Sequence, residues 1–192
     1  MERLARMTDI DQEKDLPVRY GNVDRRAFES IFAAHHQRVF SVALNFFGGD
    51  RQAAEDVTQQ VFLKIFTSAA IFRGEAGLTT WLYRITVNAC IDERRKSRRF
   101  SFLTDLFGLK EPKVKRNQEE SFDRRELSGE VRQAVGTLKP IFRWPILLKY
   151  VEGLSYREIA DILGCSEGTV ASRLNRGHKL LAEKLGHLRG EV

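Results

Sequence analysis

Cysteine is scarce in this chain, and so are long apolar runs. The two cysteines among 192 residues, Cys90 and Cys165, lie far apart and show no metal-ligand spacing, which suits a reducing compartment. No apolar run approaches the length of a membrane span, and the N-terminus lacks the apolar core of a signal peptide. We therefore expect a cytoplasmic protein.

Proline is scarce as well, and strand-like alternation of apolar and polar residues is sparse. Only four prolines occur, and many apolar residues recur at intervals of three and four, so the sequence predicts an all-α protein. Apolar residues make up 42% of the chain and charged residues 30%, which is typical of a soluble and mostly ordered protein. This length can hold one domain or two small ones.

Residues that could carry catalysis are equally scarce. His35 and His36 are adjacent, so on a helix their side chains point about 100° apart and cannot chelate one metal ion well. No Gly-rich phosphate loop follows a strand, and no Ser/His/Asp or Cys/His set can be assembled by motif. We expect no enzyme, no metal, no cofactor and no small-molecule substrate.

Composition divides the chain into four parts. Residues 1–23 are polar and without periodicity, which predicts a flexible leader, whereas residues 24–99 have dense helical patterning. Residues 100–125 join the apolar stretch FSFLTDLFGLKEP to a charged one, and we interpret them as a linker. A second helical set covers residues 126–188. The sequence thus predicts two small helical domains joined by a flexible linker.

The stretch LSYREIADILGCSEGTVASRL, residues 154–174, has the local pattern of a helix-turn-helix. Ser155 and Glu158 fit a capping box, and Gly164 is placed to end the first helix in a left-handed conformation. Ser166 is a natural N-cap for the second helix. The topology alone fits an ordinary corner between two helices equally well.

The side chains of the second helix favour a DNA-binding role over an ordinary corner between two helices. Its exposed face carries short hydroxyls, an amide and guanidinium groups, which can bond to base edges and phosphates. The net charge of +6 permits a polyanionic partner without requiring one. The residues of this helix that we place outside its buried stripe are Glu167, Gly168, Thr169, Ala171, Ser172, Arg173, Asn175 and Arg176.

The helix around Asp56 has two faces. The face that we predict to be core consists of Val57, Val61, Phe62, Ile65 and Phe66. The other face places four residues at spacings i, i+3, i+4 and i+7, namely Asp56, Gln59, Gln60 and Leu63. A leucine inside a polar, amide-rich stripe is typical of a protein-docking surface, although single exposed leucines are also common.

A basic helix is predicted from Thr79 to Arg99. It carries Arg84, Asn88 and Arg95 along one side and closes with RRKSRR. Basic residues suit a helix C-terminus through the macrodipole, but five among the last six exceed that need and would hold phosphates well. The aromatic and hydroxyl residues just upstream are suited to contact with unstacked bases. They are Phe72, Thr79, Thr80 and Trp81. For Trp81 a position in the hydrophobic core is the better interpretation.

Three blocks of this sequence resemble conserved blocks of extracytoplasmic-function (ECF) sigma factors, the compact two-domain bacterial transcription initiation factors. The blocks are AAEDVTQQVFLKIF, FRGEAGLTTWLYRITVNACIDERRKSRR and LKPIFRWPILLKYVEGLSYREIADILGCSEGTVASRLNRGHKLLAEKL. They occur in the family's order and spacing, over roughly residues 24–98 and 126–186. A lone helix-turn-helix would be far less specific, since many repressors share it.

The resemblance implies a mechanism for each domain. The first would dock on the clamp coiled coil of the β′ subunit of core RNA polymerase through Asp56, Gln59, Gln60 and Leu63. It would also melt the −10 promoter element and hold it through Phe72, Arg73, Thr79, Thr80, Arg84, Asn88, Arg94 and Arg95. The second would rest on the β-subunit flap and read the −35 element through the helix from Glu167 to Lys179.

The resemblance also implies an anti-sigma factor that wraps both domains. Such a partner is often anchored in the membrane, so this cytoplasmic chain would then be held at the inner membrane. Two positions depart from the family, which commonly has a glutamate at Gln60 and a lysine at Ala171. The apolar linker is a candidate surface for the anti-sigma factor. The alternatives are a stand-alone helix-turn-helix regulator and a nucleic-acid-processing enzyme.

Overall fold

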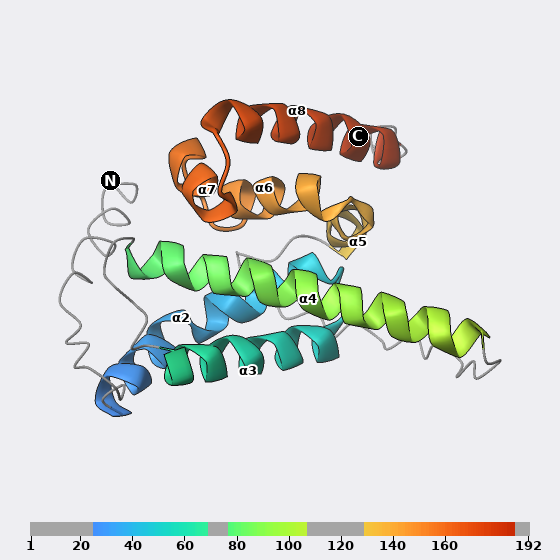
Figure 1. Ribbon diagram of the computed structural model, residues 1–192. Helices are drawn as coiled ribbons and strands as arrows, with labels where there is room; N and C mark the ends of the chain where they lie inside the picture. The colour runs from blue at the N-terminus through green and yellow to red at the C-terminus, as the bar shows by residue number, and fades with distance from the viewer. Residues whose placement is uncertain (1–24, 69–76, 107–128, 187–192) are drawn as a thin grey trace.

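The computed structural model describes residues 25–68, 77–106 and 129–186, and these ranges form seven α-helices without a strand (Figure 1). The predicted all-α fold is confirmed. The expected leader, the loop that holds Phe72 and Arg73, and most of the expected linker lie outside the described residues. The first helices are α2 (Arg25–Phe46), α3 (Arg51–Ser68) and α4 (Leu78–Leu106). The later ones are α5 (Gly129–Thr137), α6 (Pro140–Tyr150), α7 (Tyr156–Leu163) and α8 (Glu167–Lys184).

The first three helices pack around one apolar core because each has a buried stripe at helical spacing. The stripes are Val39, Val42 and Phe46 in α2, Val57, Val61 and Ile65 in α3, and Leu82 and Ile85 in α4. Helix α2 ends where Gly48 and Gly49 adopt positive φ angles of 70° and 97°. Asp50 then caps α3, since its Oδ1 accepts the backbone N–H of Ala53 at 3.1 Å.

Helix α4 is longer than the sequence analysis predicted. It continues to Leu106, so the expected end at Arg99 is wrong and the segment FSFLTDL is helical. No glycine or proline occurs between Leu78 and Leu106, so nothing in the covalent chain interrupts the hydrogen-bond ladder there. The C-terminal part of α4 projects beyond the other helices (Figure 1).

Helix α6 contains a proline that the sequence analysis expected to interrupt the second domain. Pro140 stands in the first turn of α6, where a missing N–H costs nothing, but Pro145 lies inside the helix. Pro145 and the three residues after it are buried. We attribute the intact helix to this packing, which outweighs an unfavourable local preference.

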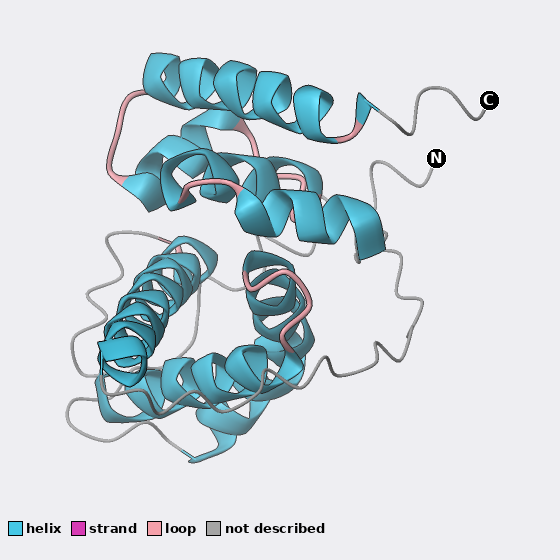
Figure 2. Cartoon of the chain, turned by 90° about the vertical axis from the view of Figure 1, so that its right-hand side faces the viewer, coloured by secondary structure: helices cyan, strands magenta, loops and turns pink. Residues whose placement is uncertain are grey.

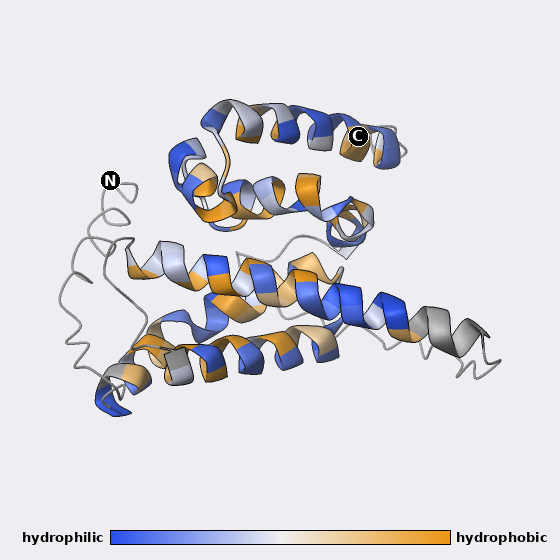
Figure 3. Ribbon diagram, viewed as in Figure 1, coloured by the Kyte–Doolittle hydropathy of each residue, from blue (hydrophilic) through white to orange (hydrophobic). Residues whose placement is uncertain are grey.

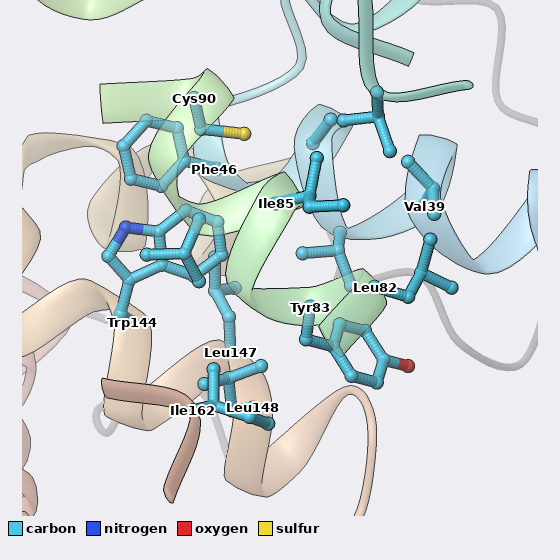
Figure 4. Close-up of a cluster of buried hydrophobic side chains, with 14 of the residues drawn as sticks. Val39, Phe46, Leu82, Tyr83, Ile85, Cys90, Trp144, Leu147, Leu148 and Ile162 are labelled. Carbon is cyan, nitrogen blue, oxygen red and sulfur yellow. The ribbon is translucent and has the colours of Figure 1, made fainter. Parts of the chain in front are cut away.

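Helices α5–α8 form a layer above α2–α4, and the two layers share one continuous apolar core (Figure 2). Phe46 of α2 stacks on Trp144 of α6 with ring centroids 4.5 Å apart. Figure 4 shows this pair beside Cys90 of α4. Contacts between the layers also join α4 to α7 and α2 to α5. The sequence pattern did not indicate a core shared by the two layers.

A fully buried arginine joins the two layers. Arg143 of α6 donates to the carbonyl oxygens of Phe46 and Leu138, at 2.5 Å each, and to that of Gly136. Its guanidinium also lies 4.7 Å from the centroid of the Phe46 ring. Burial lowers the pKa of Arg143 to about 9, and the neighbouring Arg94 and Arg98 act in the same direction. The layers therefore meet at a charged group whose burial costs free energy unless these acceptors are present.

None of the described helices is both long enough and apolar enough to cross a membrane.

A pair of glycines, Gly48 and Gly136, lets the backbones of the two layers approach each other closely, which generates a prediction. A Cβ atom on Gly136 would lie 2.9 Å from the Cα atom of Gly48, a backbone atom that cannot move aside cheaply. We expect Gly136→Ala to lower the free energy of unfolding by about 1–3 kcal/mol, as overpacking does. Urea unfolding followed by circular dichroism measures the change.

Gly168→Ala is the matched control, because the nearest atom to a Cβ there is a flexible side-chain oxygen 4.0 Å away. That change should stabilise the protein by up to about 1 kcal/mol through helix propensity. Equal stability of Gly136→Ala and the parent would contradict the close approach of the layers.

Candidate functional site

The first helix of the helix-turn-helix begins and ends as its sequence predicted. The backbone N–H of Ser155 donates to Glu158 Oε2 at 2.7 Å, and the N–H of Glu158 donates to Ser155 Oγ at 3.2 Å. Both halves of the capping box are therefore present. Gly164 ends α7 with φ 61° and ψ 43°, in the left-handed region. The predicted turn is confirmed.

Helix α8 begins at the predicted cap, and Ser166 Oγ accepts the backbone N–H of Thr169 at 3.2 Å. The predicted buried stripe consists of Val170, Leu174, Leu181 and Leu185. Val170 and Leu174 are buried, but Leu181 and Leu185 are only half-buried, so the stripe is confirmed in its first half alone. Gly177 is also buried, although the sequence pattern did not identify it. A Cβ atom there would lie 2.6 Å from Ile146 Cδ1, so glycine lets α8 approach α6 closely. The signal in the sequence was its spacing, since Gly177 follows Val170 and Leu174 on the same face of the helix.

The side chains proposed to read DNA lie outside this stripe. Six of the nine are exposed and three are half-buried, the half-buried ones being Thr169, Ala171 and Arg173. Arg173 Nη1 lies 3.6 Å from Cys165 Sγ, and the Arg176 guanidinium lies 5.8 Å from the centroid of the Phe142 ring. The exposed members are Glu167, Gly168, Ser172, Asn175, Arg176 and Lys179.

Helix α3 presents its amide-rich stripe to solvent. All four residues of the stripe are exposed, and Leu63 has an exposed fraction of 63%. The prediction that Phe66 belongs to the core is wrong, since Phe66 is 51% exposed. Phe66 lies on the shoulder of the stripe and contacts Phe28 of α2, with ring centroids 5.3 Å apart. The apolar part of this surface is thus wider than one leucine.

A groove between α2 and α3 continues this surface. It has a volume of about 420 Å³, and its lining includes Phe32, His36 and Phe62 together with Gln59 of the amide-rich stripe. The rings of Phe32 and Phe62 pack edge to face, with their centroids 4.8 Å apart. Apolar rings beside exposed amides suit a protein partner more than a polar small molecule.

Helix α4 carries the residues expected at the −10 element, and their environments differ. Thr80, Arg84 and Asn88 follow one another at a spacing of four and so share one face. Asn88 is exposed, whereas Thr79 and Thr80 are half-buried. Arg84 donates to the carbonyl oxygen of Asp161 in α7, from Nε at 3.0 Å and from Nη2 at 2.6 Å. Trp81 is half-buried and packs against the core, which agrees with the core position preferred for it from the sequence.

The basic run lies in the middle of α4. Figure 3 shows hydrophilic residues around this part of the helix. Because the helix does not end at Arg99, attraction to a helix C-terminus does not explain the run. Arg95 is exposed, and its Nη1 lies 3.7 Å from Oδ1 of Asp92. Arg94 is half-buried, with its guanidinium 6.0 Å from the Phe46 ring centroid. Burial, and then the charge of Arg98, lowers the pKa of Arg94.

Both helical layers match models of one protein family. Residues 31–100 match sigma-70 region 2, and residues 128–181 match sigma-70 region 4. The ECF RNA polymerase sigma factor SigW of Bacillus subtilis is 30% identical over 173 residues, which cover 86% of this chain and 92% of that protein. The RNA polymerase sigma-H factor of Pseudomonas aeruginosa is 29% identical over 197 residues, covering 97% of this chain and all of that one.

A solved structure gives the same result. The sigma factor RpoE from Bartonella quintana, in complex with the anti-sigma factor NepR, aligns with a TM-score of 0.66 and 25% identity. The alignment covers 84% of this chain and 98% of that one. The fold and the two matched regions define a sigma-70 family protein. This chain belongs to the ECF sigma factors of RNA polymerase.

The different environments of Arg94 and Arg95 generate a prediction. The expected role of both is phosphate contact, but only Arg95 is fully on the surface. We expect Arg95→Ala to reduce the slope of log K against log salt for promoter DNA by about 0.9, the amount for one lost phosphate contact. Titration of fluorescent promoter DNA at several salt concentrations measures this slope.

Arg94→Ala should change the slope less and should lower the free energy of unfolding by about 0.5–1 kcal/mol, since it removes a contact with the Phe46 ring. If Arg94→Ala flattened the salt dependence more than Arg95→Ala, the assignment of the two residues would be reversed.

Proposed function

We propose that this ECF sigma factor binds core RNA polymerase, directs it to specific promoters and helps to open −10 DNA, with no catalytic chemistry of its own. The observation that carries the proposal is the pairing of two surfaces in one chain. An exposed amide-rich stripe occurs in the region 2 match, and an exposed polar helix occurs in the region 4 match. A stand-alone helix-turn-helix regulator would have no use for the first surface.

The proposed docking surface is the stripe on α3, formed by Asp56, Gln59, Gln60 and Leu63. Exposed apolar area beside amides is suited to a flat protein partner, and Phe66 adds to that area. We assign the clamp coiled coil of the β′ subunit as the partner. Gln60 lacks the charge that the family commonly has here, so amide hydrogen bonds and the apolar contacts carry more of the binding.

The proposed −10 site lies on α4. Exposed Asn88 and Arg95 are suited to DNA contact on that helix, with Thr79, Thr80, Arg84 and Arg94 beside them. The proposed −35 site is α8, which presents Ser172, Asn175 and Arg176 on one side. In this assignment phosphate contacts set the position of the DNA, and contacts with base edges set the sequence preference.

We also propose an anti-sigma factor as a partner and the cytoplasm as the compartment. The sigma factor RpoE was solved with an anti-sigma factor bound, and its chain is similar to this one over nearly its full length. If the anti-sigma factor is anchored in the membrane, the chain is held at the inner membrane through it.

Run-off transcription tests the function and the docking surface together. Core polymerase with this protein should transcribe a subset of a genomic library that core polymerase alone leaves silent. Leu63→Asp should abolish that transcription and the binding of core polymerase, because it places a charge in the middle of the docking surface. It should change the free energy of unfolding by no more than roughly 0.5 kcal/mol, since Leu63 is exposed.

Ala34→Asp on α2 is the matched control, because Ala34 is exposed and lies outside the docking surface. It should transcribe like the parent. A large loss of stability in Leu63→Asp would show that Leu63 supports the fold, and full transcription by that variant would refute the docking surface.

The −35 assignment predicts a loss of sequence preference in Arg176→Ala. A good contact with a base edge is worth about 1–3 kcal/mol, so the preference for an intact over a scrambled −35 element should fall roughly tenfold or more. Transcription from the two promoters measures the preference. Lys184→Ala, which removes an exposed positive charge from the last turn of the same helix, should keep it. Equal preference in both variants would show that Arg176 does not read bases.

A further inference from the structure

Helix α8 packs on α6, and their close approach brings an aromatic ring of α6 beside the helix that we propose to read the −35 element (Figure 1). The approach is closest at Gly177, where an added Cβ atom would lie 3.5 Å from the carbonyl oxygen of Phe142. Arg176 precedes this glycine and so begins next to Phe142. Its guanidinium lies over the Phe142 ring, with Cζ 5.8 Å from the ring centroid.

The backbone on either side of Phe142 is firmly held. Pro140 fixes the first turn of α6, and the backbone N–H of Phe142 donates to the carbonyl oxygen of Lys139 at 2.9 Å. Arg143, the next residue, is fully buried and donates to three carbonyl oxygens. Phe142 is half-buried, and it is not one of the described side chains that pack against the apolar core. It therefore presents a firmly held ring to Arg176 rather than to the core.

An arginine can stack on a ring and bind a base at the same time. The guanidinium meets an aromatic ring with its flat face, whereas its N–H groups point outward in the plane of the group. Arg176 makes no hydrogen bond or ion pair with any residue that the structure describes. The ring contact therefore restricts the orientation of the guanidinium and leaves its donors available.

Two neighbours of Arg176 in the proposed site make contacts inside the helix-turn-helix instead. Ser172 Oγ donates to the carbonyl oxygen of Thr169 at 2.9 Å. Arg173 Nη1 lies 3.6 Å from Cys165 Sγ in the turn. Arg176 differs from both, because the side chain that holds it belongs to α6 and because its full set of donors faces outward.

The chemistry of the guanidinium indicates which base it reads. Guanine presents two acceptors, O6 and N7, side by side in the major groove, and arginine binds both at once. No other base has two acceptors there. This contact requires one orientation of the planar group, and a freely rotating arginine loses rotamer entropy when it adopts that orientation. A side chain that is already oriented loses less, so it binds its base more tightly.

We propose that Phe142 is a positioning residue for −35 recognition: its ring holds Arg176 by the flat face of the guanidinium, so that the N–H edge meets a guanine in the major groove. The inference rests on the proposed function, which it deepens in two ways. It extends the reading site from α8 to α6, and it names the base that Arg176 reads. Phe142 itself touches no DNA in this assignment.

Transcription from promoters randomised over the −35 element measures the base preference at each position. The assay uses core polymerase with the full-length chain, and the first comparison is between the parent and Arg176→Ala. The position at which Arg176→Ala loses its preference is the one that Arg176 reads. The base preferred there by the parent should be guanine.

Phe142→Leu removes the ring and keeps an apolar side chain. It should lower the preference for guanine at that position about two- to tenfold, the range for ordering one long side chain at an interface. The other positions should keep their preferences, and Phe142→Tyr, which keeps a ring, should behave like the parent. Tyr150→Leu is the matched control, since the Tyr150 ring on the same helix contacts His178 of α8, with centroids 5.4 Å apart, and not an arginine.

The double variant Phe142→Leu with Arg176→Ala separates positioning from general support of the fold. If Phe142 acts through Arg176, the double variant should have the same base preferences as Arg176→Ala alone. A side chain that only supports α8 would cause a further loss at every position. Circular dichroism verifies that each variant is folded. If Phe142→Leu does not fold, Phe142→Met replaces it, because methionine adapts its shape to the same space.

The ring contact can also be measured without polymerase. In nuclear magnetic resonance spectra of the free parent chain, the ring current of Phe142 should shift the Nε–H signal of Arg176, which Arg176→Ala identifies by its disappearance. The shift should be lost in Phe142→Leu and kept in Phe142→Tyr and Tyr150→Leu. This readout does not depend on DNA or on the proposed function.

Three results would overturn the positioning role. They are an Arg176 signal without a ring-current shift in the parent, a folded Phe142→Leu variant with the parent's base preferences, and a further loss in the double variant. A failure of the proposed function looks different. If the ring-current shift is present but the parent supports no transcription, the function fails and the reading role of Arg176 fails with it. If the parent transcribes and Phe142→Leu changes nothing, the positioning role alone fails.

Discussion

Carbonyl groups at helix ends need hydrogen-bond donors, and in this protein two arginines supply them across the boundary between the layers. The last carbonyl of α2, that of Phe46, accepts from Arg143 of α6. The Asp161 carbonyl near the end of α7 accepts from Arg84 of α4. Each layer therefore completes a helix of the other, and the relative position of the two domains depends on these contacts. The stacking of Phe46 on Trp144 and the approach of Gly48 to Gly136 follow from that position.

The two arginines differ in their surroundings. Arg143 is fully buried and has little choice of partner, so it fixes the end of α2 against α6. Arg84 is at the surface, where water can replace the Asp161 carbonyl at low cost. One arginine thus acts as a permanent structural group and the other as an exchangeable one. The proposed surfaces on α3 and α8 are both exposed while the two layers are packed together.

The features that the sequence predicted correctly depend on near neighbours in the chain. Ser155, Glu158, Gly164 and Ser166 act within one helical turn, and the exposure of Leu63 follows from the periodicity of α3 alone. The features that it missed depend on distant residues. Nothing near Arg84 or Arg143 in the sequence identifies a carbonyl acceptor 77 or 97 residues away.

Two smaller errors have separate causes. Phe66 lies on the apolar side of α3, but α2 does not extend over it enough to bury it. Helix α4 passes Arg99 because a basic run alone does not end a helix, and no glycine or proline follows before Leu106. The likeness to ECF sigma factors came from the order and spacing of three blocks, which is why it identified the family while leaving the packing of the layers open.

The distance between the two layers tests the account most directly. Spin labels on Ala34→Cys in α2 and Ala182→Cys in α8, in a chain without its native cysteines, lie on exposed positions of different layers. Pulsed electron resonance should give one short distance for the free chain. Addition of core polymerase and promoter DNA should replace it with a much longer one, toward the span of about 85 Å between the two elements. An unchanged short distance in a transcribing complex would contradict the account.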